Sequence, residues 1–127
     1  MAITFVRLQE YLDKIAAKGN LDPADSGHGV FWEGTYQAFL SGVVPNKHCG
    51  GHAVPIVDPN NKVNSAFYQI LKAGWCTSPA MPQMPRTGPF VTDAGYSITL
   101  SDNTVVTGAQ ILQDIEDWLK AGAPEHG

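Results

Sequence analysis

The stretch TGAQILQDIEDWLKAGAP, from Thr107 to Pro124, is the strongest helix signal in the chain. Thr107 and Gln110 form a T-x-x-Q capping box, a pair that satisfies backbone donors where a helix begins. Gly122 followed by Pro124 marks the point where the helix ends. Between these signals, apolar residues recur at helical spacing and make a wide apolar face: Ile111, Leu112, Ile115, Trp118 and Leu119. Such a face must be buried against another element.

A second amphipathic segment lies at the opposite end of the chain. Its apolar residues recur three or four positions apart, and Gly19 follows as a stop signal: Phe5, Leu8, Leu12, Ile15 and Ala16. Polar residues interrupt the apolar run, so the segment reads as an ordinary helix rather than a targeting segment. We expect the two terminal helices to bury their apolar faces against each other.

Two shorter helices are expected between them. The first covers residues 35–42, with Thr35 as its cap and Gly42 as its stop. The second covers residues 64–74, with Asn64 or Ser65 as its cap and Gly74 as its stop. The segment 53–62 reads as extended chain followed by a turn, because it holds two prolines. Residues 75–95 form a long Pro-rich connection, and residues 96–107 alternate as a small hairpin would.

These signals predict one all-α domain over residues 1–127. It would have about four short helices, long Pro/Gly-rich loops and one small β-hairpin. The composition agrees with a loop-rich domain, because 13 Gly and 9 Pro accompany only 16% charged residues. A chain of 127 residues is long enough to bury a core of its own.

The charge distribution argues against two classes of partner. The net charge is −4 and the pI is near 5.4, and the eight Lys and Arg residues are scattered, so we expect no nucleic-acid partner. No stretch approaches the roughly 18 apolar residues that a membrane span needs, so no membrane partner is expected. The given chain also shows no signal peptide.

The motif HCGGH, residues 48–52, is the most unusual stretch for chemistry. The chain has two cysteines, Cys49 and Cys76, which permits one disulfide without proving it. The bridge would close a loop of about 27 residues and contribute about 3–4 kcal/mol in the chain-entropy model. It would also indicate an oxidising location: an extracellular, periplasmic or particle-associated protein.

The same motif admits a metal site. His48, Cys49 and His52 are candidate ligands for zinc or copper, with Cys76 or His28 completing the set. The spacing is not one of the strong zinc patterns, and two glycines would leave the ligands loosely held. Cys49 beside two histidines is also a candidate nucleophile, but no carboxylate is evidently placed to orient either imidazole. We therefore expect no enzyme activity.

Three segments, taken in order, resemble c-type cytochromes of the planctomycete type. PIVDPNNKVNSAFYQIL is similar to the family pattern V-x-P-x-x-P-x-x-S-x-L-Y-x-x-L. PQMPRTGPF is similar to its M-P-x-x-G-P loop, and ILQDIEDWLKAGAP resembles its C-terminal helix. The resemblance covers roughly residues 36–124 and implies the all-α cytochrome c fold.

The resemblance also implies a vacated haem site. In that family a C-x-x-C-H motif binds haem through two thioethers, and its His and a Met are the axial ligands. Aligning His52 with the family's His places His48 and Gly51 at the two cysteine positions, and neither can form a thioether. Covalent haem is therefore excluded, while His52 and Met84 match the axial ligands by residue type.

We therefore expect a haem-free structural or interaction module without a cofactor, in a homo- or hetero-assembly or bound to another protein. Its binding surface would use loop aromatics that we expect to be exposed, namely Trp75, Phe90 and Tyr96. The alternatives are an electron-transfer protein that holds haem non-covalently through His52 and Met84, and a zinc- or copper-binding domain.

Overall fold

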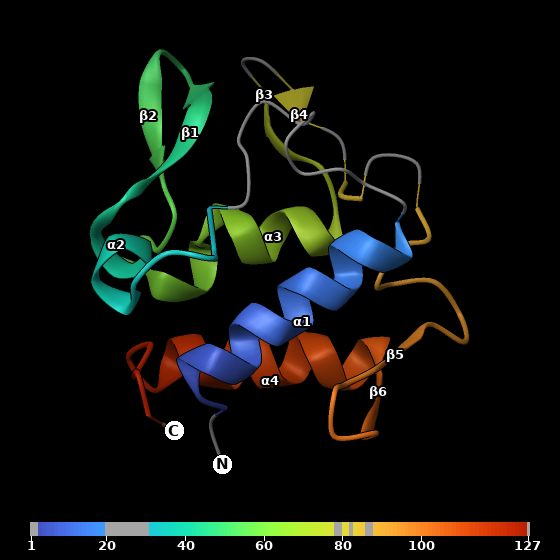
Figure 1. The fold of residues 1–127 in the computed structure, drawn as a ribbon. Coiled ribbons are helices and arrows are strands. Elements are labelled where there is room, and N and C mark those ends of the chain that lie inside the picture. The colour runs from blue at the N-terminus through green and yellow to red at the C-terminus, as the bar shows by residue number, and fades with distance from the viewer. Residues whose placement is uncertain (1–2, 20–30, 78–79, 82, 86–87, 127) are drawn as a thin grey trace.

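Two helices from opposite ends of the chain form the centre of the computed structural model (Figure 1). They are α1 (Phe5–Lys18) and α4 (Gly108–Lys120). The structure describes residues 3–19, 31–77, 80–81, 83–85 and 88–126. The backbone amide of Phe5 donates to the Glu125 carbonyl at 2.9 Å, so the two ends of the chain lie side by side. The buried faces of both helices belong to one core cluster, and the Tyr11 hydroxyl of α1 donates to the Asp114 carboxylate of α4 at 2.6 Å.

The helix caps follow the sequence signals. The Thr4 hydroxyl accepts from the Arg7 amide at 3.1 Å, and the Thr107 hydroxyl accepts from the Gln110 amide at 3.3 Å. The Gln110 side-chain nitrogen donates to Asp114 at 2.7 Å, so this side chain is engaged with the next turn of α4. In a full capping box its oxygen would accept from the Thr107 amide. The first helix buries every predicted apolar residue and also Tyr11, which the apolar pattern did not include.

Within the described residues, three short helices lie between these two: α2 (Tyr36–Ser41), the 3-10 turn η2 (Lys62–Asn64) and α3 (Ala66–Lys72). Phe39 of α2 lies at the centre of an aromatic cluster that joins them to the terminal helices. Its ring centroid is 5.2–6.2 Å from those of three other rings: Phe5, Phe67 and Trp118. Aromatic pairs at these distances add stability beyond the area that they bury.

The prediction of an all-α fold is wrong, because the structure is a mixed α/β fold. Six short strands in the described residues form three separate two-stranded antiparallel sheets. The first pairs β1 (Val43–Cys49) with β2 (His52–Pro55), the second β3 (Trp75–Thr77) with β4 (Ala80–Met81), and the third β5 (Ser97–Thr99) with β6 (Val105–Thr107). Only the third sheet, within the hairpin expected at residues 96–107, agrees with the sequence prediction.

The first missed sheet has a clear local cause. Gly50 and Gly51 both have positive φ angles, 60° and 82°. Two consecutive positive φ angles define a type I′ turn, which matches the twist of a two-residue hairpin. The interpretation of HCGGH as a degenerate haem motif did not predict a turn at these two glycines. Pro55 argues against a central strand, but a two-stranded ribbon consists of edge strands, where proline is tolerated.

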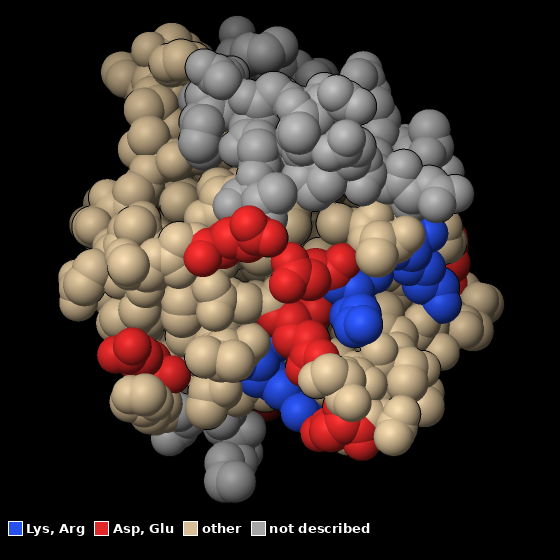
Figure 2. All heavy atoms as spheres, viewed as in Figure 1, with Lys and Arg blue, Asp and Glu red and all other residues tan. Residues whose placement is uncertain are grey.

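On the face shown in Figure 2, acidic side chains form a run across the middle of the face, and basic side chains lie beside this run. Arg7 pairs with Asp102 at 3.2 Å, and Lys120 pairs with Glu116 at 3.3 Å. Hydrogen bonds from Thr104, with a smaller contribution from Arg7, lower the pKa of Asp102 to about 2. No helix within the described residues is long and apolar enough to cross a membrane.

Candidate functional site

The HCGGH motif forms the tip of the β1–β2 hairpin, which projects from the helical body in Figure 1. Cys49 at its tip is joined to Cys76 of β3 by a disulfide, with the two Cα atoms 6.0 Å apart and 27 positions apart in sequence. The predicted Cys49–Cys76 pairing is therefore confirmed in the structure. The bond joins two hairpins that belong to separate sheets.

The strand register places the motif's side chains on two faces of the hairpin. Cys49 pairs with His52, and His48 pairs with Ala53. Directly paired residues share a face, and consecutive residues alternate. Cys49 and His52 therefore lie on one face, and His48 lies on the other.

This geometry does not bring the candidate metal ligands together. His48 is on the opposite face from His52, and the Cys49 sulfur is bonded to Cys76. Within the part of the chain that the structure describes, no group of three or more His, Cys, Asp or Glu side chains is placed to hold a metal ion. His28, the other proposed ligand, lies outside the described residues. The proposed set of His48, Cys49 and His52 is thus not assembled as a site.

The two candidate haem ligands also lie on different parts of the molecule. His52 is exposed beside the hairpin turn, whereas Met84 is half-buried and its amide donates to the Ile70 carbonyl at 2.9 Å. Figure 1 shows the tip of the β1–β2 hairpin well apart from residues 83–85. Met81 pairs with Trp75 and packs against the core cluster. The structure does not bring His52 and Met84 together around a shared space.

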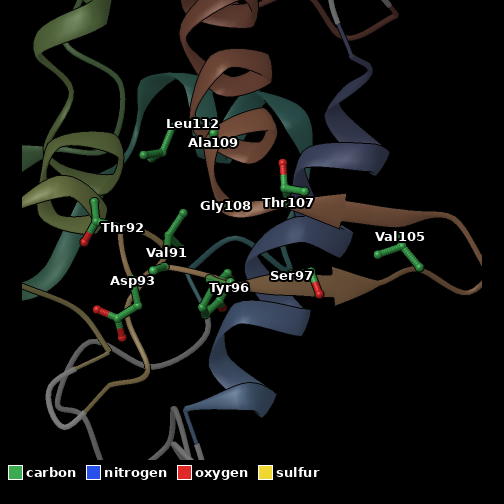
Figure 3. Close-up of a pocket in the computed structure, with 12 residues that line it drawn as sticks. Val91, Thr92, Asp93, Tyr96, Ser97, Val105, Thr107, Gly108, Ala109 and Leu112 are labelled. Carbon is green, nitrogen blue, oxygen red and sulfur yellow. The ribbon is translucent and has the colours of Figure 1, made fainter.

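A separate open cavity of about 690 Å³ lies beside the first turn of α4 (Figure 3). The loop 91–97 forms one wall, and Val105 and residues 107–109 with Leu112 form the other. Asp93 lines the cavity, and its carboxylate accepts from the Phe90 amide at 2.8 Å. Among the described lining residues, no second carboxylate and no imidazole accompanies Asp93 as a partner for general acid–base chemistry.

The three loop aromatics expected on the surface are more enclosed than the sequence suggested. Tyr96 is only 5% exposed, and Trp75 and Phe90 are half-buried. The Tyr96 hydroxyl is buried without a hydrogen-bond partner among the described residues, and burial raises its pKa to about 12. The sequence held no signal for this burial, because Tyr96 belongs to a core cluster whose members come from segments far apart in the sequence. The Lys18 ammonium of α1 lies 4.9 Å from the Tyr96 ring centroid.

Two tyrosine-to-phenylalanine changes should have opposite effects on stability. Tyr96→Phe removes an unpartnered buried hydroxyl, so we expect the free energy of unfolding to rise by about 1 kcal/mol. Tyr11→Phe removes a hydroxyl that donates to Asp114 at 2.6 Å, so we expect it to fall by about 1.5–3 kcal/mol. Urea denaturation of both variants measures the difference. Equal effects of the two changes would contradict the assigned hydrogen bonding.

Comparisons with known proteins found no match: no family model, curated protein or solved structure matches the chain. The site therefore rests on its own geometry. The feature that sequence reasoning missed here is the Gly50–Gly51 turn. A Gly-Gly pair between two short apolar stretches is a recognised hairpin signal, and it was present in the sequence.

Proposed function

We propose that this protein is a haem-free, non-enzymatic module that binds an extended segment of a protein partner. The binding surface is the ribbon surface, which we define as the exposed residues of the β1–β2 hairpin: Val43, His48, His52, Ala53 and Pro55. The observation that carries the proposal is that this hairpin projects from the body and is held by the Cys49–Cys76 disulfide.

The backbone of the hairpin supports this choice of partner. In a two-residue hairpin, the pair next to the turn exchanges hydrogen bonds, and the following pair directs its backbone groups outward. Here the outward pair is His48 and Ala53. No third strand within the described residues pairs with either edge of the hairpin. Unpaired edges of this kind accept an added strand from a partner, and side chains on the added strand provide specificity.

The chemistry of the ribbon surface fits a binding role better than a catalytic one. The described side chains of the hairpin include two titratable groups, His48 and His52, which lie on opposite faces. Val43 is 49% exposed and adds apolar area. Descent from a c-type cytochrome is a proposal that rests on the three sequence segments alone, because the all-α fold that the resemblance implies is not the fold of this chain.

A selection experiment tests the proposal while the partner is still unidentified. A library of displayed random peptides is selected against the immobilised protein, and the enriched peptides are then measured against two variants. Ala53→Lys places a charged side chain on the hairpin edge, which should block strand addition and weaken binding at least about tenfold. Ala17→Lys makes the same change at an exposed position of α1 and should leave binding unchanged.

Two outcomes would reject the binding surface: no enriched peptides, or peptides that bind equally well to Ala53→Lys. Light scattering over a concentration series tests whether a second copy is the partner, since self-association should also be lost in Ala53→Lys. Addition of haem to the purified protein tests the assignment of the module as haem-free. A Soret band that survives dialysis would show retained haem and would overturn the haem-free assignment.

A further inference from the structure

The disulfide spans two ribbons that share no strand pairing. The β1–β2 and β3–β4 hairpins are separate two-stranded sheets, each with its own register. An isolated two-stranded hairpin is only marginally stable in water, so each ribbon depends on what holds it to the body. The Cys49–Cys76 bond joins the two ribbons to each other near their tips, so each ribbon supports the other there.

The base of the β1–β2 hairpin is anchored independently of the disulfide. Val44 and Val54 are buried in the core cluster, and the Ile56 amide donates to the Gly42 carbonyl at 3.1 Å. The tip is different, because all the residues from His48 to Ala53 except Cys49 are exposed. Breaking the disulfide should therefore free the tip but leave the base in place.

The second ribbon, β3–β4, is likewise anchored to the helical body away from the disulfide. Beyond β4, the Met84 amide donates to the Ile70 carbonyl of α3 at 2.9 Å. Within β3, Cys76 has a φ angle of 67°, in the left-handed region that a residue with a Cβ atom rarely adopts. This backbone strain is retained by the surrounding structure, of which the disulfide is one part. Release of Cys76 permits its backbone to relax.

We propose that the Cys49–Cys76 bond is a reversible thiol-modification site that acts as a latch between the two hairpin tips. The reactant is a dithiol reductant. One of its thiolates attacks a cysteine sulfur and forms a mixed disulfide, and the other cysteine leaves as a thiolate. The second thiol of the reductant then displaces the remaining cysteine. The reductant is oxidised to its own disulfide, and two electrons and two protons pass to Cys49 and Cys76, which become thiols.

The position of the sulfur atoms fits this role. Cys49 and Cys76 are both half-buried, so a small dithiol has access to the bond without unfolding the core. The buried faces of α1 and α4 include neither cysteine. Reduction therefore opens residues 48–53 and 75–77 and leaves the helical body folded. The latch does not rest on the proposed binding function, because its opening is measured without a partner.

Hydrogen exchange with thiol counting tests the latch on the full-length protein. Excess dithiothreitol under native conditions should release two thiols and accelerate amide exchange at residues 48–53 and 75–77 by at least about tenfold. The far-UV circular dichroism signal of the helices should stay unchanged, because α1 and α4 remain folded after reduction. Their most protected amides exchange through global unfolding and report the loss of global stability instead. Re-oxidation should restore the original pattern. The Cys49→Ala/Cys76→Ala double variant should match the reduced protein.

Three results would overturn the latch. The first is a bond that resists reduction until the protein unfolds. The second is the release of two thiols without faster exchange at the tips. The third is loss of the helical circular dichroism signal on reduction. If the double variant does not fold, reduction of the wild-type chain still distinguishes these results. Peptide binding that fails while the tips open as expected would reject the proposed function alone.

Discussion

Replacement of Trp118 by alanine lowers the free energy of unfolding by about 3–5 kcal/mol, the range for loss of a fully buried large aromatic side chain. Trp118 is 0% exposed, and its ring centroid is 6.2 Å from that of Phe39. Its indole nitrogen also donates to the Pro124 carbonyl at 2.7 Å, which ties the chain end to α4. The change therefore removes packing and leaves that carbonyl without its donor.

Urea denaturation followed by far-UV circular dichroism measures this effect. Val6→Ala is the matched control, because Val6 is an apolar residue of α1 that is 72% exposed, and its loss should change stability by less than about 0.5 kcal/mol. A Trp118→Ala protein within 1 kcal/mol of wild type, on the order of an average point mutation, would show that α4 does not pack as described.

Removal of the disulfide is expected to have an effect of similar size. Cys49→Ala/Cys76→Ala should lower the free energy of unfolding by about 3–4 kcal/mol, because closing a loop of this length restricts the unfolded chain. The sequence separation that sets this value is 27 residues. Equilibrium urea unfolding of the oxidised wild type and of the double variant measures the difference.

Reduced and alkylated wild-type protein provides the comparison that separates the bond from the alanine side chains. It should lose the same stability as the double variant. If oxidised and reduced proteins unfold at the same urea concentration, the cross-link does not constrain the unfolded state. The loss concerns global unfolding, which the most protected amides of α1 and α4 report, whereas the latch concerns local opening, which the amides of the two hairpin tips report.

The helices could be predicted because their signals are local. A cap such as Thr107 bonds to an amide three residues away, and an apolar face repeats every three or four residues. The side chain of Gln110 shows the limit of this reasoning. It satisfies the capping-box pattern in sequence, but in the structure its nitrogen donates to Asp114, one turn later.

The sheets could not be predicted equally well. The β3–β4 pairing brings only Trp75 and Thr77 opposite Met81 and Ala80, which is too short for an alternating pattern to be visible. The β1–β2 hairpin had a local signal in Gly50–Gly51. However, the resemblance of the chain to c-type cytochromes favoured the interpretation of HCGGH as a degenerate haem motif instead of a hairpin turn. A family resemblance thus obscured a turn that backbone geometry explains directly.

The sequence by itself determined the four α-helices, the apolar faces of the two terminal helices, the small hairpin at 96–107 and the possibility of a Cys49–Cys76 bond. These follow from hydrogen bonds and periodicities within a few residues, or from the count of cysteines. The tertiary structure decided that His48 and His52 face apart, that His52 and Met84 stand on separate parts of the molecule, and that Tyr96 is buried. Each of these depends on strand register or on contacts between distant segments. A one-residue shift in strand pairing moves every side chain of the strand to its other face, so the register cannot be read from local sequence alone.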